Sequence, residues 1–243
     1  MRVPLSLACG AYDRTAALAR ADIRPEGVDL TFLALPVEET FFRMTRHREF
    51  DAAEMSLSSY LISLDQGAPF VAIPAFVSRA FRHNGIYVGA ASGAADPAGQ
   101  AGGVVGVAEY QLTANVDPRR EEERYFAQTG VFPVMHVVVV RREVYEQRPW
   151  LAQSLYKAFE QARREAAARL AETAAGASLL PWAYAEAERT RDVMGADFWT
   201  YGLAGNEDTL GTFVRYACEQ ALISREREPA ELFAPETREA YVI

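Results

Sequence analysis

Two arginines and a histidine lie close together in the stretch FVSRAFRHNGIYV, residues 76–88, between two apolar runs. Arginine binds carboxylates through two parallel hydrogen bonds, so Arg79 and Arg82 are candidates for holding an anion. They are three residues apart, and therefore share a face if the segment is helical and diverge if it is extended. The competing interpretation makes them surface arginines at the edge of a strand. His83 adds an imidazole, so the stretch is a candidate anion site with a proton-transfer group beside it.

Three side chains are candidates for moving a proton: His83, His136 and Glu54. His136 stands between FPVM and a run of four valines, at the expected start of a core strand. A histidine in such a place is either catalytic or a hydrogen-bonded core residue. Glu54 follows a short predicted strand and precedes a predicted helix. Partial burial there would raise its pKa and make it a general acid, whereas in the alternative it is a charge that interacts with the helix dipole.

Polar side chains also follow the ends of several predicted strands, where open α/β sheets bind ligands. Hydroxyls and backbone N–H groups at helix starts hold anions there, although a serine in this position is also a common N-cap. The further candidate substrate-binding residues are Tyr12, Arg14, Ser56, Ser58, Tyr110, Gln111 and Thr113.

The composition excludes several classes of function. The chain has 243 residues, half of them hydrophobic, and a net charge of −8. Its basic residues are scattered, which argues against a nucleic-acid partner because phosphate neutralisation needs a basic face. No apolar segment reaches the length of a membrane span, and the N-terminal apolar run is too short for a secretory signal. We therefore expect a cytoplasmic protein that binds small molecules.

No cofactor is predicted. The two cysteines, Cys9 and Cys218, are far apart and fit buried thiols better than a disulfide. The sequence contains no P-loop and no glycine fingerprint for a dinucleotide after a strand. The histidines have no metal-ligand spacing, so a divalent metal held by His83, Glu54 and His136 is left open but not required.

Short apolar runs alternate with helical patterns, which is typical of an α/β fold. We expect strands at residues 4–10, 27–35, 50–56, 70–76, 85–90, at the start of 103–114, and at 132–145; helices are expected at 38–47, 57–66, 148–176, 181–195 and 206–224. The Gly/Ala/Pro-rich residues 92–103 predict a boundary between lobes. The charge run that follows, up to residue 130, is typical of a solvated loop or helix.

Motifs along nearly the whole chain are similar to one known family. They are ACGAYDRT, RPEGVDLTFLALPVEETFFRM, EFDAAEMSLSSYLISLDQG, FVAIPAFVSRAFRHNGIYV, VGVAEYQLTA, TGVFPVMHVVVVRREVYEQRPWLAQSLYKAF, MGADFWTYGL and ELFAPETREAY. In these the chain resembles the 4,5-dihydroxyphthalate decarboxylase family. The resemblance implies a periplasmic-binding-protein-like type II fold with two lobes, related to substrate-binding proteins of ABC transporters.

This chain departs from the family in one segment, which builds most of the second lobe in the family and is reduced here to about residues 115–124. We therefore expect a truncated second lobe, with lobe 1 formed by residues 1–92 and 131–243 and the shortened lobe 2 by residues 93–130.

The resemblance implies non-oxidative decarboxylation of 4,5-dihydroxyphthalate, or a related aromatic carboxylate, to 3,4-dihydroxybenzoate and CO2. Such a reaction needs a general acid, a general base and a group that holds the remaining carboxylate. The resemblance favours Arg79 and His83 as cleft residues opposite the VGVAEYQ turn. We therefore expect an Arg79→Ala variant to fold normally and to lose affinity for phthalate-type ligands. The alternative function is a non-catalytic binding protein for a small carboxylate. The sequence leaves the oligomeric state open.

Overall fold

The chain divides into two compact units, which we describe separately. The computed structural model describes residues 2–82, 86–87, 106–107, 117–173 and 178–238. The first unit comprises Met1–Arg79 and Val134–Ile243, and the second comprises Ala80–Pro133. The predicted lobe boundary at residues 92 and 93 lies outside the described residues, so those lobe limits stay a prediction.

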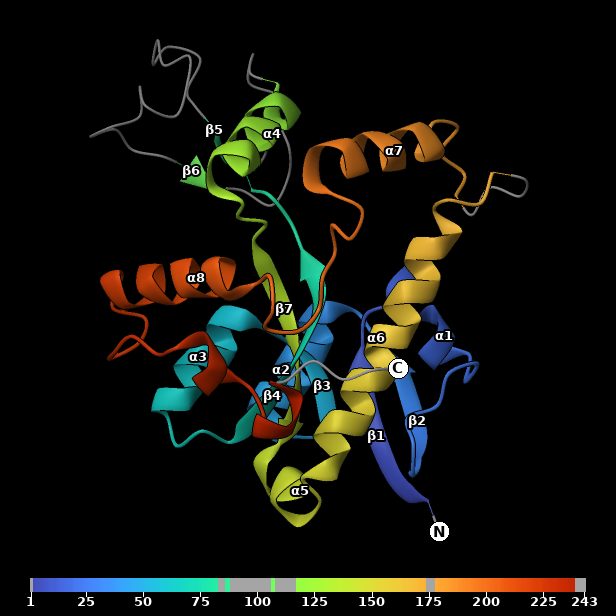
Figure 1. Ribbon diagram of the computed structural model, residues 1–243. Coiled ribbons are helices and arrows are strands. Elements are labelled where there is room, and N and C mark those ends of the chain that lie inside the picture. Colours follow the sequence, from blue (N-terminus) through green and yellow to red (C-terminus); the bar gives the residue numbers. More distant parts are fainter. Residues whose placement is uncertain (1, 83–85, 88–105, 108–116, 174–177, 239–243) are drawn as a thin grey trace. The chain divides into compact units, whose positions relative to one another are not determined.

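A five-stranded mixed sheet forms the centre of the first unit, in the order β2-β1-β3-β7-β4. Its strands are β1 (Val3–Cys9), β2 (Val28–Ala34), β3 (Ala52–Ser56), β4 (Phe70–Arg79) and β7 (Val134–Arg141). β1 is parallel to both β2 and β3, whereas β7 is antiparallel to both β3 and β4. The carboxyl ends of β1, β3 and β4 and the amino end of β7 therefore lie at one edge of the sheet (Figure 1).

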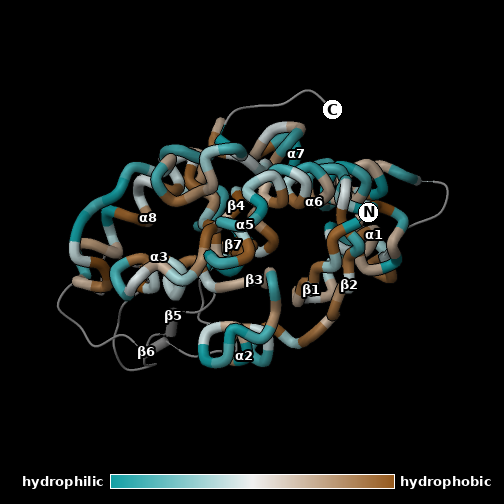
Figure 2. The backbone as a smooth tube through the Cα atoms, turned by 90° about the horizontal axis from the view of Figure 1, so that it is seen from below, coloured by the Kyte–Doolittle hydropathy of each residue, from teal (hydrophilic) through white to brown (hydrophobic). Residues whose placement is uncertain are grey.

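Helices cover both faces of this sheet. The long helix α6 lies along one face and α2 along the opposite face, while α3 packs against β3, β4 and β7 (Figures 1 and 2). The helices of this unit are α1 (Ala16–Ala19), α2 (Val37–His47), α3 (Leu57–Asp65), α5 (Arg142–Gln147), α6 (Trp150–Arg169), α7 (Ala183–Met194) and α8 (Glu207–Glu219); 3₁₀ turns occupy Asp13–Thr15, Pro229–Leu232 and Pro235–Thr237.

The sequence explains most of these elements. The four valines Val137–Val140 are at most 1% exposed, as expected of a strand covered on both faces. The predicted strand 132–145 is too long: it ends at Arg141, and α5 begins at the next residue. The predicted helix 148–176 ends earlier, at Arg169. The predicted strand 70–76 is too short, because β4 continues through Arg79.

In the second unit, the charge run forms the helix α4 (Pro118–Thr129). Asp117 caps its start by accepting a hydrogen bond from the Arg119 N–H at 3.1 Å, and Gly130 ends it in the left-handed conformation at φ 66°. The short strands β5 (Ile86–Tyr87) and β6 (Gly106–Val107) pair in the antiparallel sense. A search of the described residues of both units finds no helix with the length and apolar character needed to cross a membrane.

Candidate functional site

Glu54 is the middle residue of β3, within the strand rather than after it as expected from the sequence, and its carboxylate is the centre of a buried polar cluster. The residue has no exposed surface. Its Oε2 accepts hydrogen bonds from the Gly10 N–H at 2.8 Å and from the Cys9 thiol at 3.4 Å. Its Oε1 accepts one from the Tyr12 hydroxyl at 2.7 Å and lies 2.6 Å from His136 Nδ1. Both oxygens are therefore satisfied, as a buried carboxylate requires.

The topology of the sheet explains why residues so distant in sequence meet. His136 pairs with Ser56 across the β3–β7 ladder, so its side chain is the diagonal neighbour of Glu54 on the same face. Gly10 and Tyr12 follow β1, the other neighbour of β3. A Cβ atom at position 10 would lie 2.6 Å from the Tyr12 ring, so the absence of a side chain at Gly10 lets that ring approach.

The hydrogen bonds decide the charge of Glu54. Burial raises the pKa of its carboxyl, but the hydrogen bonds from His136, Gly10 and Tyr12 outweigh burial and bring the pKa below its ordinary value. The raised pKa that we expected from the sequence is therefore not found, because that expectation considered burial without these donors. Glu54 is an ionised acceptor at neutral pH rather than a general acid.

The neighbours of Glu54 respond in the opposite direction. Burial, and next the nearby Glu54 carboxylate, raises the pKa of the Tyr12 hydroxyl. The same two causes raise the pKa of the Cys9 thiol. Both groups therefore stay protonated and act as donors to the carboxylate.

His136 is held in a fixed orientation. It is the third residue of β7, as expected from the sequence, and its side chain is 16% exposed. Its Nδ1 faces Glu54, and the ring of Phe41 packs against it edge-on with the centroids 4.9 Å apart. A carboxylate on Nδ1 favours the tautomer protonated there, which leaves Nε2 as the ring atom that can exchange a proton with a ligand.

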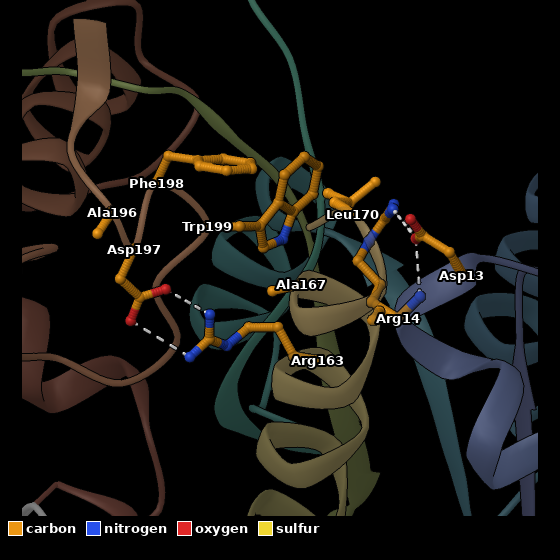
Figure 3. A pocket seen from close by; sticks show the side chains of 10 residues that line it. Asp13, Arg14, Arg163, Ala167, Leu170, Ala196, Asp197, Phe198 and Trp199 are labelled. Atoms are coloured by element: carbon orange, nitrogen blue, oxygen red, sulfur yellow. Dashed lines mark hydrogen bonds and ion pairs between the residues drawn. The ribbon is translucent and has the colours of Figure 1, made fainter. Parts of the chain in front are cut away.

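Arg14 lies on the other side of Tyr12. Its guanidinium carbon is 4.2 Å from the centroid of the Tyr12 ring and 4.3 Å from that of the Trp199 ring. Nε donates to the Val77 carbonyl at 2.6 Å, and Nη1 donates to Asp13 at 3.1 Å (Figure 3). The two aromatic rings and the carbonyl fix the guanidinium in place.

Two serines lie at the start of α3. Ser56 precedes the helix but makes no side-chain capping bond, and its hydroxyl lies 2.9 Å from that of Ser58. Ser56 therefore occupies the N-cap position, as one interpretation of the sequence expected, but its hydroxyl faces another hydroxyl instead of the helix N–H groups. Ser56 is next to His136 in the sheet.

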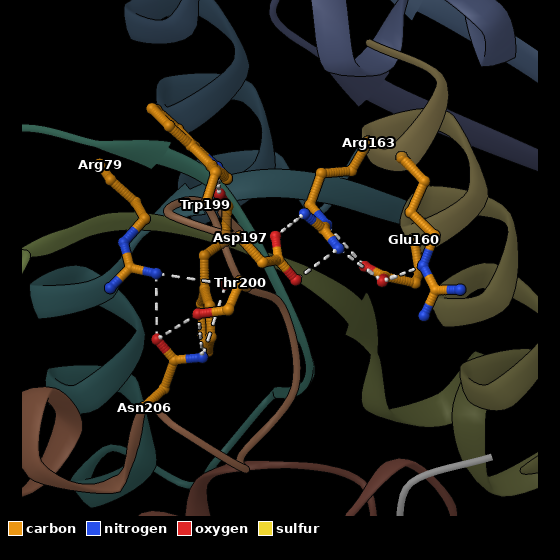
Figure 4. Close-up of polar contacts among 9 residues, drawn as sticks. Arg79, Glu160, Arg163, Asp197, Trp199, Thr200 and Asn206 are labelled. Atoms are coloured by element: carbon orange, nitrogen blue, oxygen red, sulfur yellow. Dashed lines mark hydrogen bonds and ion pairs between the residues drawn. The ribbon is translucent and has the colours of Figure 1, made fainter. Parts of the chain in front are cut away.

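Arg79 lies inside the protein, which contradicts the surface interpretation, and its role in ligand binding stays a prediction. It ends β4 and is only 7% exposed, and its Nη1 donates to the Thr200 carbonyl at 3.2 Å and to Asn206 Oδ1 at 3.0 Å (Figure 4). Burial lowers its pKa to about 10. It is therefore not a surface arginine, and it connects β4 to the segment 199–206. Arg82 is exposed, and the shared helical face with Arg79 is not formed because Arg79 ends a strand and residues 80–82 are not helical.

Four predicted site residues, His83, Tyr110, Gln111 and Thr113, lie outside the described residues. One of them, His83, is also a ligand of the divalent-metal site that the sequence left open. Elsewhere in the chain, the described His, Cys, Asp and Glu residues form no group of three or more that could hold a metal ion.

The sequence analysis missed Gly10 and Trp199. Trp199 lies in the MGADFWTYGL motif, and its Nε1 donates to the Phe76 carbonyl at 2.9 Å. Its position in that motif was the available signal. For Gly10 the only signal in the sequence was its position at the end of the first predicted strand.

Comparison with solved structures concerns the fold alone, because all identities are low. A protein from Bordetella bronchiseptica RB50 matches with a TM-score of 0.50 and 12% identity over 97% of this chain and 94% of that one. A protein of Candida albicans described as having the generic periplasmic binding protein fold has a TM-score of 0.43 and 11% identity over 79% and 81% of the two chains. The mixed sheet with helices on both faces confirms the α/β fold predicted from the sequence, and the match at a TM-score of 0.50 shows a shared fold.

Curated proteins identify the family. No protein-family model matches the chain. A 4,5-dihydroxyphthalate decarboxylase of Comamonas testosteroni is 31% identical over 328 residues, which cover 100% of this chain and 99% of that protein. One of Pseudomonas putida is 44% identical over 116 residues, 47% of this chain and 45% of that protein. The chain belongs to the 4,5-dihydroxyphthalate decarboxylase family. The 328-residue alignment is longer than the 243-residue chain, as expected if this chain has a shortened segment.

Proposed function

We propose that this protein removes one carboxylate of 4,5-dihydroxyphthalate, or of a related aromatic dicarboxylate, and yields 3,4-dihydroxybenzoate and CO2. The observation that carries the proposal is the Glu54–His136 pair, with its 2.6 Å contact at the ligand-binding edge of the sheet. The relationship to the Comamonas testosteroni protein over nearly its full length supports the choice of reaction.

The chemistry explains what such a pair contributes. A phenol para to the departing carboxylate loses its proton and pushes an electron pair into the ring. The ring carbon that carries the carboxylate takes up a proton, its bond to the carboxylate breaks, CO2 leaves with the ring aromatic again, and the phenolate regains its proton. The net reaction consumes one proton. In our proposal His136 Nε2 delivers that proton, and Glu54 orients the ring and balances its positive charge.

Other residues support the same reaction. Tyr12 donates to Glu54 and so keeps the carboxylate ionised beside His136. Ser56, Ser58 and Arg14 supply hydroxyl and guanidinium donors near the same strand ends, and we propose that they bind the aromatic carboxylate. For Arg79, the contacts with Thr200 and Asn206 favour a positioning role over direct contact with the substrate.

Incubation of the purified chain with 4,5-dihydroxyphthalate tests the proposal. We expect release of CO2 with equimolar 3,4-dihydroxybenzoate. Phthalate is the matched control, because it carries both carboxylates but no phenol to push electrons, and should release no CO2. Thermal stabilisation by both compounds without CO2 release would contradict the decarboxylase and favour the alternative, a non-catalytic carboxylate-binding protein. The cytoplasmic location stays a prediction, which cell fractionation tests.

A further inference from the structure

A cavity lies beside Arg14, entirely within the first unit. Its volume is about 160 Å³ (Figure 3). The side chains that matter for its chemistry are Arg14, Ala166, Ala167, Leu170, Phe198 and Trp199. α6 provides a wall of small and aliphatic side chains, and the segment after α7 provides the two aromatic ones.

The size of this cavity matches one aromatic ring. An apolar cavity of about 150 Å³ in a protein interior is large enough to bind benzene. The alanines and the rings of Phe198 and Trp199 offer apolar surface for such a ring.

Two arginines, Arg14 and Arg163, line the cavity, and Arg14 is the one that can bind a ligand carboxylate. Arg163 is 5% exposed, bonds to Glu160 through two contacts of 2.7 Å and also binds Asp197, so two carboxylates compensate it (Figure 4). Arg14 has only the exposed carboxylate of Asp13 as its ion-pair partner among the described residues, and its Nη2 makes no hydrogen bond to any of them. An exposed ion pair of this kind is weak, so a ligand carboxylate can compete for Arg14.

We propose that this cavity binds a single-ring aromatic carboxylate, with the ring between the α6 wall and Trp199 and a carboxylate on Arg14. This inference rests on the proposed function, because it makes the cavity a binding subsite for aromatic carboxylates such as the proposed substrate. Tyr12 connects the two places, because its ring carries the Arg14 guanidinium and its hydroxyl holds Glu54.

Titration of the full chain with phthalate, followed by calorimetry, tests the proposal. Ala167→Phe fills the cavity, and Ala168→Phe is the matched control on the exposed side of the same helix. We expect Ala167→Phe to weaken phthalate binding at least about ten-fold, since the ring loses its space, and Ala168→Phe to leave it unchanged. Phthalate affinity equal to the wild type in a folded Ala167→Phe variant would overturn the proposal.

A gain-of-affinity variant keeps the test decisive if Ala167→Phe does not fold. Asp13→Asn removes the competing carboxylate and should tighten phthalate binding by about two- to five-fold, the range of an exposed ion pair. No change, or weaker binding, would contradict the role of Arg14. The two proposals fail in distinguishable ways. If the wild type releases no CO2 but both variants change phthalate affinity as expected, only the decarboxylase is refuted. If the wild type releases CO2 but neither variant changes phthalate affinity, only the cavity proposal is refuted.

Discussion

Glu54→Gln changes the charge of the central carboxylate while keeping its size. In the wild type, four donors converge on its two oxygens. A glutamine has one oxygen, which can stay with Gly10, and an NH2 group that must then face Tyr12 and His136. Because that group donates, the His136 Nδ1 has to become an acceptor and its proton moves to Nε2. The variant therefore favours the opposite histidine tautomer.

The magnitude follows from the bonds that are replaced. The charge-assisted contact with His136 is lost, which should cost about 1.5–3 kcal/mol of unfolding free energy. The rate should fall by about 10²–10⁴, the usual contribution of general acid–base catalysis, since the variant lacks the carboxylate that orients the His136 ring and balances its charge during proton delivery. Glu38→Gln, at an exposed position of α2, is the control for loss of one negative charge.

Two measurements check this prediction. The chain has three histidines, so ¹⁵N NMR can assign the tautomer of each, and CO2 release gives the rate. A Glu54→Gln variant with the wild-type tautomer and the wild-type rate would refute the reasoning.

The pH dependence has a definite sign. The pKa of Glu54 in the folded state lies below its ordinary value of 4.5, so the stability it provides is complete above pH 4.5 and is lost as pH falls through the folded value. The difference in unfolding free energy between the wild type and Glu54→Gln, measured by urea unfolding, should therefore shrink as the pH falls below 4.5.

Three further predictions concern neighbouring contacts. Tyr12→Phe removes the hydroxyl donor to the buried Glu54 carboxylate but keeps the ring over Arg14, so kcat should fall by about three- to ten-fold and the unfolding free energy by about 1.5–3 kcal/mol; an unchanged kcat would contradict it. Arg79→Met should cost about 1–3 kcal/mol in urea unfolding, because the Thr200 carbonyl and Asn206 Oδ1 lose the Arg79 donor and keep only their longer contacts with each other's residues; a normally stable variant that loses phthalate affinity would favour the direct ligand role expected from the sequence. Glu160→Gln should lower the unfolding free energy by about 2 kcal/mol at neutral pH, because it weakens the contacts with Arg163. Those arginine contacts lower the Glu160 pKa despite burial, so the loss of stability should diminish below pH 4.5. A loss that does not depend on pH would contradict this.

The local elements were predictable because their signals are local. The strands β1, β2 and β3 and the helices α2 and α3 follow the expected ranges closely. The boundary between β7 and α5 was not predictable, since Val144 and Tyr145 follow the strand closely and are residue types that favour strands.

The site depends on long-range pairing, which spacing cannot reveal. Glu54 and His136 were each identified as candidates, but 82 residues separate them, and only the β3–β7 register brings them together. The partners of Arg79 could not be predicted for the same reason, because Thr200 and Asn206 are 121 and 127 residues away in sequence. The donors around Glu54 reversed the expected direction of its pKa shift.

The most direct test of the account compares the wild type with His136→Asn, which removes the second ring nitrogen that we assign to proton delivery. CO2 release from 4,5-dihydroxyphthalate and affinity for phthalate are measured on both proteins. The account predicts turnover by the wild type, a rate lower by about 10²–10⁴ in the variant, and nearly equal affinity for phthalate in both. A variant that releases CO2 at the wild-type rate would contradict the assignment of His136 as the proton donor.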